Sequence, residues 1–324
     1  MEILEKTIAQ IREQFGLAGG ILVAVKDGKV LLKESFGYAD AEAGKLNDNK
    51  TLFQIASCSK AFTTMVAGQL CDEGKMTWDT PVKQLMPDFK MMDKYAEEHV
   101  TPRDMACHRT GLCRHDVMRT FVREDRADLV RRIAYFPPAF GFREKYSYQN
   151  QMYVALGYLC ERLTGKTWEE LLKEKIGDPL GMDMYFRGID TIEDKNAAMP
   201  YSQQDGKIYR VPEVVVRQAI HAVDFILIWT AWNAGFGCWQ TEENLTANAS
   251  SVKRALQNSS NQMSASRDVR HIRQSCRNPM HLHGLPQFIR VIQLHSIPVP
   301  PTDLTRWSDS SRKKMQHLLC RLIP

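Results

Sequence analysis

Ser57 and Lys60 stand three positions apart in the segment FQIASCSKAFTTMVAGQLCDEGKMT, residues 53–77. Positions i and i+3 lie on one face of a helix, so the two side chains can meet if this segment is helical. A serine hydroxyl is a weak nucleophile at neutral pH and needs a base within hydrogen-bond distance. A lysine becomes a usable base when apolar neighbours, here Cys58 and Met65, partly desolvate it and lower its pKa. The spacing indicates nucleophilic catalysis, and a helix-capping serine followed by a surface lysine is the alternative.

A second polar group, Tyr148-Gln149-Asn150, follows about 90 residues later. Tyrosine ordinarily titrates near pH 10, and a neighbouring lysine ammonium favours its phenolate form. A core tyrosine next to a helix-capping asparagine is the alternative for this group. Tyr146 is a rival two residues earlier, but only Tyr148 stands in a Tyr-x-Asn pattern.

The surroundings of both groups resemble the serine β-lactamase-like family, which includes class C β-lactamases, D-alanyl-D-alanine carboxypeptidases of the penicillin-binding protein group and esterases. The resemblance covers about residues 5–217. Besides the Ser-x-x-Lys segment, its similar stretches are FGYADAEAGKLNDNKTLFQIAS, VTPRDMACHRTGL, with Thr110 in place of the usual serine, and KYSYQNQMYVALGYLCERLTGKTWEELLKEKIGDPLGM.

The resemblance implies acyl transfer and hydrolysis through a Ser57 acyl-enzyme, on an amide, ester or β-lactam. It implies that Lys60 and Tyr148 act as base and acid, and that Asn150 orients Lys60 and binds the substrate's amide or carbonyl. No metal or organic cofactor is expected, and the partner is a small-molecule or peptide substrate. His108 and His115 lack a suitably spaced acidic or histidine ligand, so we expect them to pack within a loop.

The hydrophobic and turn patterns predict helix, hairpin and then mostly helices. GGILVAVKDGKVLLKESFGYAD reads as two strands joined at Asp27-Gly28. Helices are expected over 2–16, 58–74, 127–135, 150–164 and 167–176, with Gly165 between the last two. The predicted fold is α/β plus all-α and β-lactamase/transpeptidase-like, with an antiparallel sheet flanked by helices and a helical insertion. The strands expected near the C-terminus are missing or scrambled.

The last 107 residues differ in composition from the rest of the chain. Residues 1–217 carry 31 Lys+Arg and 32 Asp+Glu, whereas residues 218–324 carry 12 and 6. The resemblance implies a third element, Lys/His-x-Gly, on a strand that supplies half of an oxyanion hole, and no position in 218–324 matches it. We therefore expect an incomplete hydrolase domain at 1–217 and a non-matching basic tail at 218–324. A catalytically inactive relic or binding protein is the alternative function.

A shifted reading frame offers one explanation for this tail. If each shifted codon takes the last base of one codon and the first two of the next, Trp232-Asn233 must give Glu and Trp239-Gln240 must give Ala. Within such limits, residues 228–248 can read LDGLERWVWLLADGGKLDGK, an amphipathic helix with a Gly-Gly stop. We predict a frameshift near residue 224, and a divergent C-terminus is the alternative.

Composition restricts the remaining functional classes. No window of 18 apolar residues exists, so no membrane span is expected. The N-terminus lacks the basic and apolar regions of a signal peptide, and the eight cysteines are scattered without a CxxC pair. These features favour a cytoplasmic protein with free thiols. The basic tail lacks aromatic interleaving or an arginine stripe, so nucleic-acid binding is not expected.

Overall fold

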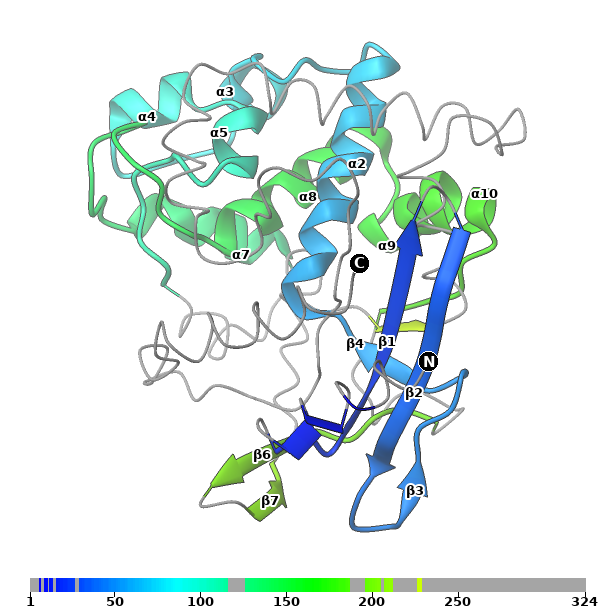
Figure 1. Cartoon of the computed structure of the whole chain (residues 1–324). Coiled ribbons are helices and arrows are strands. Elements are labelled where there is room, and N and C mark those ends of the chain that lie inside the picture. Colours follow the sequence, from blue (N-terminus) through cyan, green and yellow to red (C-terminus); the bar gives the residue numbers. More distant parts are fainter. Residues whose placement is uncertain are drawn as a thin grey trace. The chain divides into compact units, whose positions relative to one another are not determined.

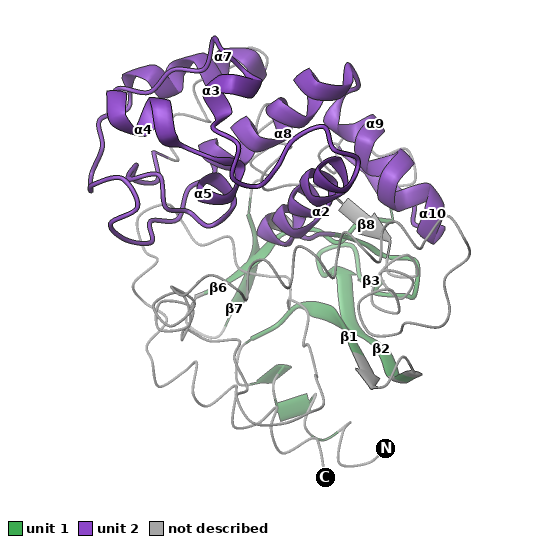
Figure 2. Ribbon diagram, turned by 90° about the horizontal axis from the view of Figure 1, so that it is seen from above, with its two compact units in different colours: residues 1–53, 192–214, 278–324 green, residues 54–191, 215–277 purple. Residues whose placement is uncertain are grey.

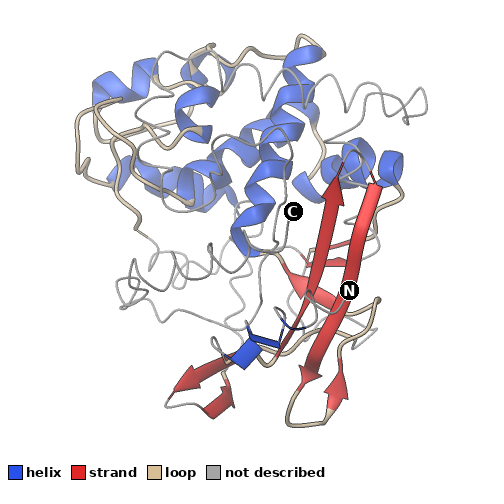
Figure 3. Cartoon of the chain, viewed as in Figure 1, coloured by secondary structure: helices blue, strands red, loops and turns tan. Residues whose placement is uncertain are grey.

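A computed structural model of the chain describes residues 16–26, 29–115, 126–186, 196–204, 207–211 and 226–228, together with five residues between 6 and 13. The chain divides into two compact units, which are coloured separately in Figure 2. Unit 1 comprises residues 1–53, 192–214 and 278–324, and unit 2 comprises residues 54–191 and 215–277. Unit 1 contains the two long strands, whereas unit 2 is mainly helical, as Figure 3 shows.

The described part of unit 1 is built on a β-hairpin. Strand β1 (Gly19–Lys26) pairs antiparallel with β2 (Lys29–Asp40), and the short β3 (Lys45–Leu46) pairs with the far end of β2. Two residues separate Lys26 from Lys29, which pair with each other, so the hairpin predicted from the sequence is confirmed. A second hairpin joins β6 (Tyr201–Gln204) to β7 (Lys207–Arg210).

Unit 2 is organised around two helices of 14 residues each, α2 (Ser59–Asp72) and α8 (Gln151–Thr164). They lie side by side in Figure 1, and both also contact α9 (Trp168–Leu172). The buried indole of Trp168 on α9 donates a hydrogen bond from Nε1 to Thr63 Oγ1 on α2 at 3.1 Å. This bond and the apolar core of the unit fix the rotation of α2, and therefore the direction of the side chains at its start.

Shorter elements complete the described chain. The other helices are α3 (Val82–Leu85), α4 (Lys94–His99), α5 (Pro102–Ala106), α7 (Arg126–Arg132) and α10 (Asp178–Leu180). Tighter or wider turns are the 3₁₀ turns η1 (Ala56–Cys58) and η2 (Ile133–Tyr135) and the π turn η3 (Lys173–Gly177). The remaining strands are β4 (Leu52–Gln54), β5 (Met184–Tyr185) and β8 (Ile226–Ile228), of which β5 and β8 pair antiparallel.

Helix ends follow the local sequence signals. Thr101 and Asp104 form a capping box at the start of α5, with Pro102 at its first position, so two buried backbone donors that have no partner within the helix are satisfied. Gly165 ends α8 in the left-handed conformation with φ of 72° and separates it from α9, as the sequence predicted. Most of the helix predicted over residues 2–16 lies outside the described residues, although residues 6, 9, 10, 12 and 13 are helical.

Candidate active site

Ser57 lies in the 3₁₀ turn η1, immediately before α2. Its side chain is exposed, whereas Lys60 in the first turn of α2 is only 6% exposed. The ammonium Nζ of Lys60 donates a hydrogen bond to Ser57 Oγ at 3.2 Å. The three-residue spacing therefore brings these two side chains together, as the sequence predicted.

Tyr148 joins this pair from a segment 91 residues away. Its hydroxyl donates a hydrogen bond to Ser57 Oγ at 2.7 Å. The ammonium of Lys60 lies 4.9 Å from the centre of the Tyr148 ring and 5.4 Å from that of Tyr153. Two tyrosine rings thus face Lys60, whereas Cys58, which we expected to desolvate it, is exposed. Tyr153 had no role in the sequence interpretation, although its position in the first turn after Asn150 was a usable signal.

The arrangement places an accessible hydroxyl between two groups that can carry its proton. When Ser57 Oγ attacks a carbonyl carbon, its proton must move to a base, and either Lys60 or Tyr148 is within reach. The guanidinium of Arg114 lies 5.1 Å from the centre of the Tyr148 ring, so positive charge approaches this ring from two residues. Positive charge close to a phenol stabilises its phenolate form, which is the form that can accept a proton.

His108 holds the backbone around Tyr148. The carbonyl oxygen of His108 accepts a hydrogen bond from the Ser147 N–H at 2.9 Å, and its Nδ1 accepts one from the Gln149 N–H at 3.0 Å. The His108 ring also lies 4.5 Å from the Tyr148 ring, centre to centre. We expected His108 to pack within a loop, and the loop in which it packs is the one that carries Tyr148.

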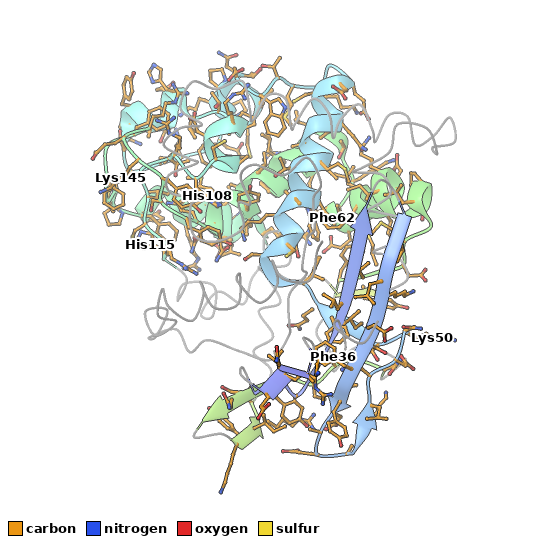
Figure 4. The ribbon with its side chains drawn as sticks, in the orientation of Figure 1. Phe36, Lys50, Phe62, His108, His115 and Lys145 are labelled. Atoms are coloured by element: carbon orange, nitrogen blue, oxygen red, sulfur yellow. The ribbon has the colours of Figure 1, made fainter. Side chains whose placement is uncertain are left out.

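The imidazole of His108 is neutral. It is 7% exposed, and burial, followed by the positive charges of Lys60 and Arg114, lowers the pKa of His108 to about 3. Because Nδ1 accepts a hydrogen bond, the neutral ring carries its proton on Nε2. His108 and His115 are both labelled in Figure 4, within unit 2.

A buried pair supports the same loop. Thr110, which stands where the resembling family has a serine, donates from Oγ1 to Gln149 Oε1 at 3.2 Å. Gln149 Nε2 in turn donates to the carbonyl oxygen of Cys113 at 3.3 Å. Both Thr110 and Gln149 are buried, so these bonds form where unsatisfied polar groups are costly. Gln149, for which the sequence predicted no role, therefore supports the loop that carries Tyr148.

Tyr146 and Asn150, the two other candidates from the sequence, have no hydrogen bond to Ser57 among the interactions of the described residues. Tyr146 lies against the His108 ring with a centre-to-centre distance of 5.5 Å, and it is Tyr148 that reaches Ser57. Asn150 is buried immediately before α8, where its carbonyl oxygen accepts the Tyr153 and Val154 N–H groups at 3.0 Å. Its expected action on Lys60 and on substrate stays a prediction.

Within the described ranges, no group of three or more His, Cys, Asp or Glu side chains is arranged to hold a metal ion. Among the helices that the structure describes, none is long and apolar enough to cross a membrane.

Comparison with known proteins identifies the family. A family model described as Beta-lactamase matches residues 4–284. The chain belongs to the beta-lactamase family. The match extends beyond residue 217, where the resemblance seen in the sequence ends. Expectations for 218–324, including the absent third element and the shifted frame, lie outside the described residues, apart from the strand β8.

Several curated relatives of this beta-lactamase family chain carry the names of hydrolases. An unguisins hydrolase of Aspergillus campestris is 33% identical over 180 residues, which are 53% of this chain and 34% of the relative. A D-aminopeptidase of Brucella anthropi is 31% identical over 193 residues, 56% of this chain and 35% of the relative. The chain thus spans about a third of the length of these two proteins.

Solved structures share the fold. An octameric penicillin-binding protein homologue from Pyrococcus abyssi has a TM-score of 0.64 at 23% identity, covering 77% of this chain and 58% of its own. A class C beta-lactamase from Rhodobacter sphaeroides has a TM-score of 0.63 at 19% identity, covering 79% and 70%. The predicted β-lactamase/transpeptidase-like fold is therefore confirmed.

Proposed function

We propose that this chain is a serine hydrolase that forms an acyl-enzyme on Ser57. One observation carries the proposal: Lys60 and Tyr148, which are distant in sequence, both lie within hydrogen-bond distance of the exposed Ser57 Oγ. The names of the curated relatives, among them a D-aminopeptidase and a teichoic acid D-alanine hydrolase, support hydrolysis as the reaction class.

The proposed acylation step uses the three side chains as follows. Tyr148, as a phenolate stabilised by the neighbouring ammonium of Lys60, takes the proton of Ser57 while Oγ bonds to the substrate carbonyl carbon. The tetrahedral intermediate then expels the amine or alcohol, which receives that proton from Tyr148. The bond that breaks is the one between the carbonyl carbon and the leaving group, and the product is an ester on Ser57.

Deacylation reverses the roles with water as the nucleophile. Water loses its proton to Tyr148, attacks the ester carbon and releases the acid, after which Ser57 Oγ regains a proton. Asn150 is proposed to orient Lys60 and to bind the substrate amide or carbonyl, as the family resemblance implies. The substrate is an amide, ester or β-lactam of a small molecule or peptide.

A binding protein without catalysis is the second candidate. It is favoured by the sequence of residues 218–324, in which no Lys/His-x-Gly element was found. In the resembling family this element lies on the strand that supplies one oxyanion-hole donor. Loss of one such donor slows acyl transfer on the order of a hundred- to a thousandfold.

Turnover of simple substrates distinguishes the two candidates. We expect the folded protein to hydrolyse para-nitrophenyl acetate, and Ser57→Ala to lower kcat/KM about a thousandfold. Ser59→Ala is the matched control, because it removes a hydroxyl two residues away and keeps most of the rate. If the wild type, Ser57→Ala and Ser59→Ala are all folded and hydrolyse the ester at the same slow rate, the result would support the binding candidate and contradict the hydrolase.

A further inference from the structure

Cys113 and His115 form a thiol–imidazole pair in unit 2. The Sγ atom of Cys113 lies 3.2 Å from Nε2 of His115, which Figure 4 labels. Both side chains are half-buried. Neither of them takes part in the hydrolysis proposed at Ser57, so the pair is a second combination of a nucleophilic group with a base.

The position of His115 is held through its ring and through its backbone. The ring stacks on that of Phe136, with the centres 4.5 Å apart and an angle of 23° between the planes. The carbonyl oxygen of His115 accepts a hydrogen bond from Gln151 Nε2 at 2.6 Å, and that of Cys113 accepts one from Gln149 Nε2 at 3.3 Å. The thiol and the imidazole therefore meet in a geometry that is set in advance, which favours a reaction that needs both.

A thiol that contacts an imidazole is poised to act as a nucleophile. The thiolate is the reactive form of cysteine, and a neighbouring imidazolium favours it over the thiol. Movement of the proton from Sγ to Nε2 turns the pair into a thiolate and an imidazolium that remain in contact. A thiolate of this kind attacks a disulfide sulfur.

A buried hydrogen-bond acceptor lies at the same segment. Gln151 is 3% exposed, and its Oε1 accepts no hydrogen bond from any residue that the structure describes. The Nε2 atom of the same amide group is bonded to the carbonyl oxygen of His115. Buried acceptors are usually satisfied, so a ligand that brings an N–H group to this segment would gain a hydrogen bond. Small peptide disulfides carry such N–H groups.

Two other described cysteines differ from Cys113 in exposure and in surroundings. Cys58 is exposed, whereas Cys113 is half-buried. Cys71 is half-buried as well, but it packs against the apolar core, and burial, followed by the negative charge of Asp72, raises the pKa of Cys71 to about 12. Exposure alone therefore predicts that Cys58 reacts first, whereas contact with an imidazole predicts that Cys113 does.

We propose that Cys113, with His115 as its base, is a modification site that forms a mixed disulfide with a small peptide disulfide. The Cys113 thiolate attacks one sulfur of the disulfide, so a new bond to Sγ forms and the original S–S bond breaks. The departing sulfur leaves with the electron pair of that bond and takes the proton held by His115 Nε2. Cys113 is thereby oxidised, and the departing half of the disulfide is reduced to a thiol.

The modification should also lower the activity proposed for Ser57, and this consequence rests on the proposed hydrolase. The carbonyl oxygen of Cys113 is bonded to Gln149, and the adjacent Tyr148 reaches Ser57 Oγ with its hydroxyl. A group added to a half-buried thiol displaces the atoms around it. We therefore expect the mixed disulfide to shift the loop that carries Tyr148 away from Ser57.

The modification rates of individual cysteines test the proposal. The folded protein would be treated with glutathione disulfide, and the mixed disulfide at each cysteine would be followed over time by mass spectrometry. We expect Cys113 to react about tenfold faster than Cys58, and Cys71 to react more slowly than both. His115→Asn should lower the rate at Cys113 about tenfold and leave that at Cys58 within about twofold. Asparagine suits this position because His115 has a φ of 45°.

Cys160 serves as an internal control for folding, because it is buried and reacts only when the core opens. A rate at Cys113 that is unchanged in His115→Asn, while Cys160 stays unmodified, would overturn the proposal. A wild-type rate at Cys113 below that at Cys58 would overturn it as well. That second comparison needs no substitution, so it decides the question even if His115→Asn unfolds.

Ester turnover separates this site from the hydrolase. Glutathione disulfide should lower kcat/KM of the wild type for para-nitrophenyl acetate about tenfold, and dithiothreitol should restore it. Cys113→Ser should have the wild-type rate and keep it during the treatment, whereas the matched control Cys58→Ser should be inhibited as the wild type is.

The two proposals can fail separately. If Cys113 is modified as expected but turnover does not depend on Ser57, the hydrolase proposal fails and the modification site stands. If turnover depends on Ser57 and Cys113 reacts no faster than Cys58, the hydrolase stands and the modification site is refuted. Inhibition that persists in Cys113→Ser would refute the control of Ser57 by Cys113.

Discussion

His108 binds the backbone on both sides of Tyr148. Its carbonyl oxygen accepts the Ser147 N–H at 2.9 Å, and its Nδ1 accepts the Gln149 N–H at 3.0 Å. Any shift of the Tyr148 backbone therefore breaks a hydrogen bond to His108. We interpret His108 as a positioning residue that holds the Tyr148 hydroxyl on Ser57 Oγ.

Replacing His108 should slow catalysis through Tyr148. His108 has a φ of 57°, which alanine adopts only with strain and asparagine tolerates, and an asparagine Oδ1 can replace Nδ1 as the acceptor. We expect His108→Ala to lower kcat about a hundredfold, because small displacements of catalytic groups have effects of this size, and His108→Asn to recover most of the rate. A purely structural role predicts that both variants lose stability without a change in kcat per folded molecule.

The neutral, buried His108 should make the protein sensitive to acid. In the unfolded chain its side chain takes up a proton below about pH 6.5, whereas the folded protein takes it up only near pH 3. The unfolded state therefore binds more protons between these values, and the stability contribution, complete above pH 6.5, is lost as the pH falls toward 3.

Urea denaturation of the wild type and His108→Asn at several pH values measures this effect. Between pH 7 and pH 4.5 the wild type should lose about 2–3 kcal/mol more of its unfolding free energy than the variant. Other carboxylates and histidines titrate in both proteins, so the difference isolates His108. Parallel pH curves for the two proteins are the outcome that contradicts a buried neutral imidazole.

Lys60 should be needed for activity and dispensable for folding. Its ammonium is nearly buried, so Lys60→Met removes a costly buried charge and should leave stability equal or higher. The same change should lower kcat/KM about a thousandfold, because the proposed Tyr148 phenolate loses the neighbouring ammonium that stabilises it.

Lys83 provides the opposite case in the same unit. It pairs at 2.5 Å with Glu97, whose side chain is only 4% exposed, and Lys83 has no contact with Ser57 or Tyr148 among the interactions of the described residues. Lys83→Met should lower the melting temperature while kcat/KM stays near the wild-type value. If Lys60→Met instead lowers the melting temperature and keeps its activity, Lys60 has the structural role that we assign to Lys83, and its catalytic role is contradicted.

Two glycines test how tightly the loop before Tyr148 is packed. Gly111 and Gly165 have φ of 85° and 72°, but a Cβ at Gly111 would lie 2.7 Å from the Phe140 carbonyl oxygen, whereas one at Gly165 would meet nothing within 4 Å. Gly165→Ala should cost about 1 kcal/mol of unfolding free energy from backbone strain alone. Gly111→Ala should cost about 2–3 kcal/mol, measured by chemical denaturation, since it adds a clash with backbone. If the two substitutions lower the unfolding free energy equally, the Phe140 backbone must move away from the new Cβ at little cost.

The elements that the sequence predicts well are those with strong local signals. The hairpin of β1 and β2 follows from the two-residue turn signal Asp27-Gly28, and α8 ends where Gly165 adopts a left-handed conformation. The hairpin of β6 and β7 was missed, because strands of four residues, with the side chains of β7 exposed, leave little hydrophobic pattern.

In the candidate site, too, the contacts between residues near in sequence were predictable and the long-range contacts were not. Ser57 and Lys60 are local, so a helix spacing of three residues is enough to bring them together. The roles of His108 and Arg114 depend on contacts with residues more than 30 positions away, which helical or strand periodicity does not encode. The C-terminal expectations stay predictions, and re-reading the DNA across codons 215–250 for an extra or missing base tests them.

The residue that a serine-directed reagent modifies shows most directly whether Ser57 is the nucleophile. The folded protein would be treated with a fluorophosphonate, digested, and the adduct located by tandem mass spectrometry. We predict a single adduct on Ser57, lost in Ser57→Ala, retained in Ser59→Ala and formed much more slowly in Lys60→Met. Folded protein that gains no adduct, or that is labelled equally with and without the Ser57 hydroxyl, would contradict the claim that Ser57 is the nucleophile.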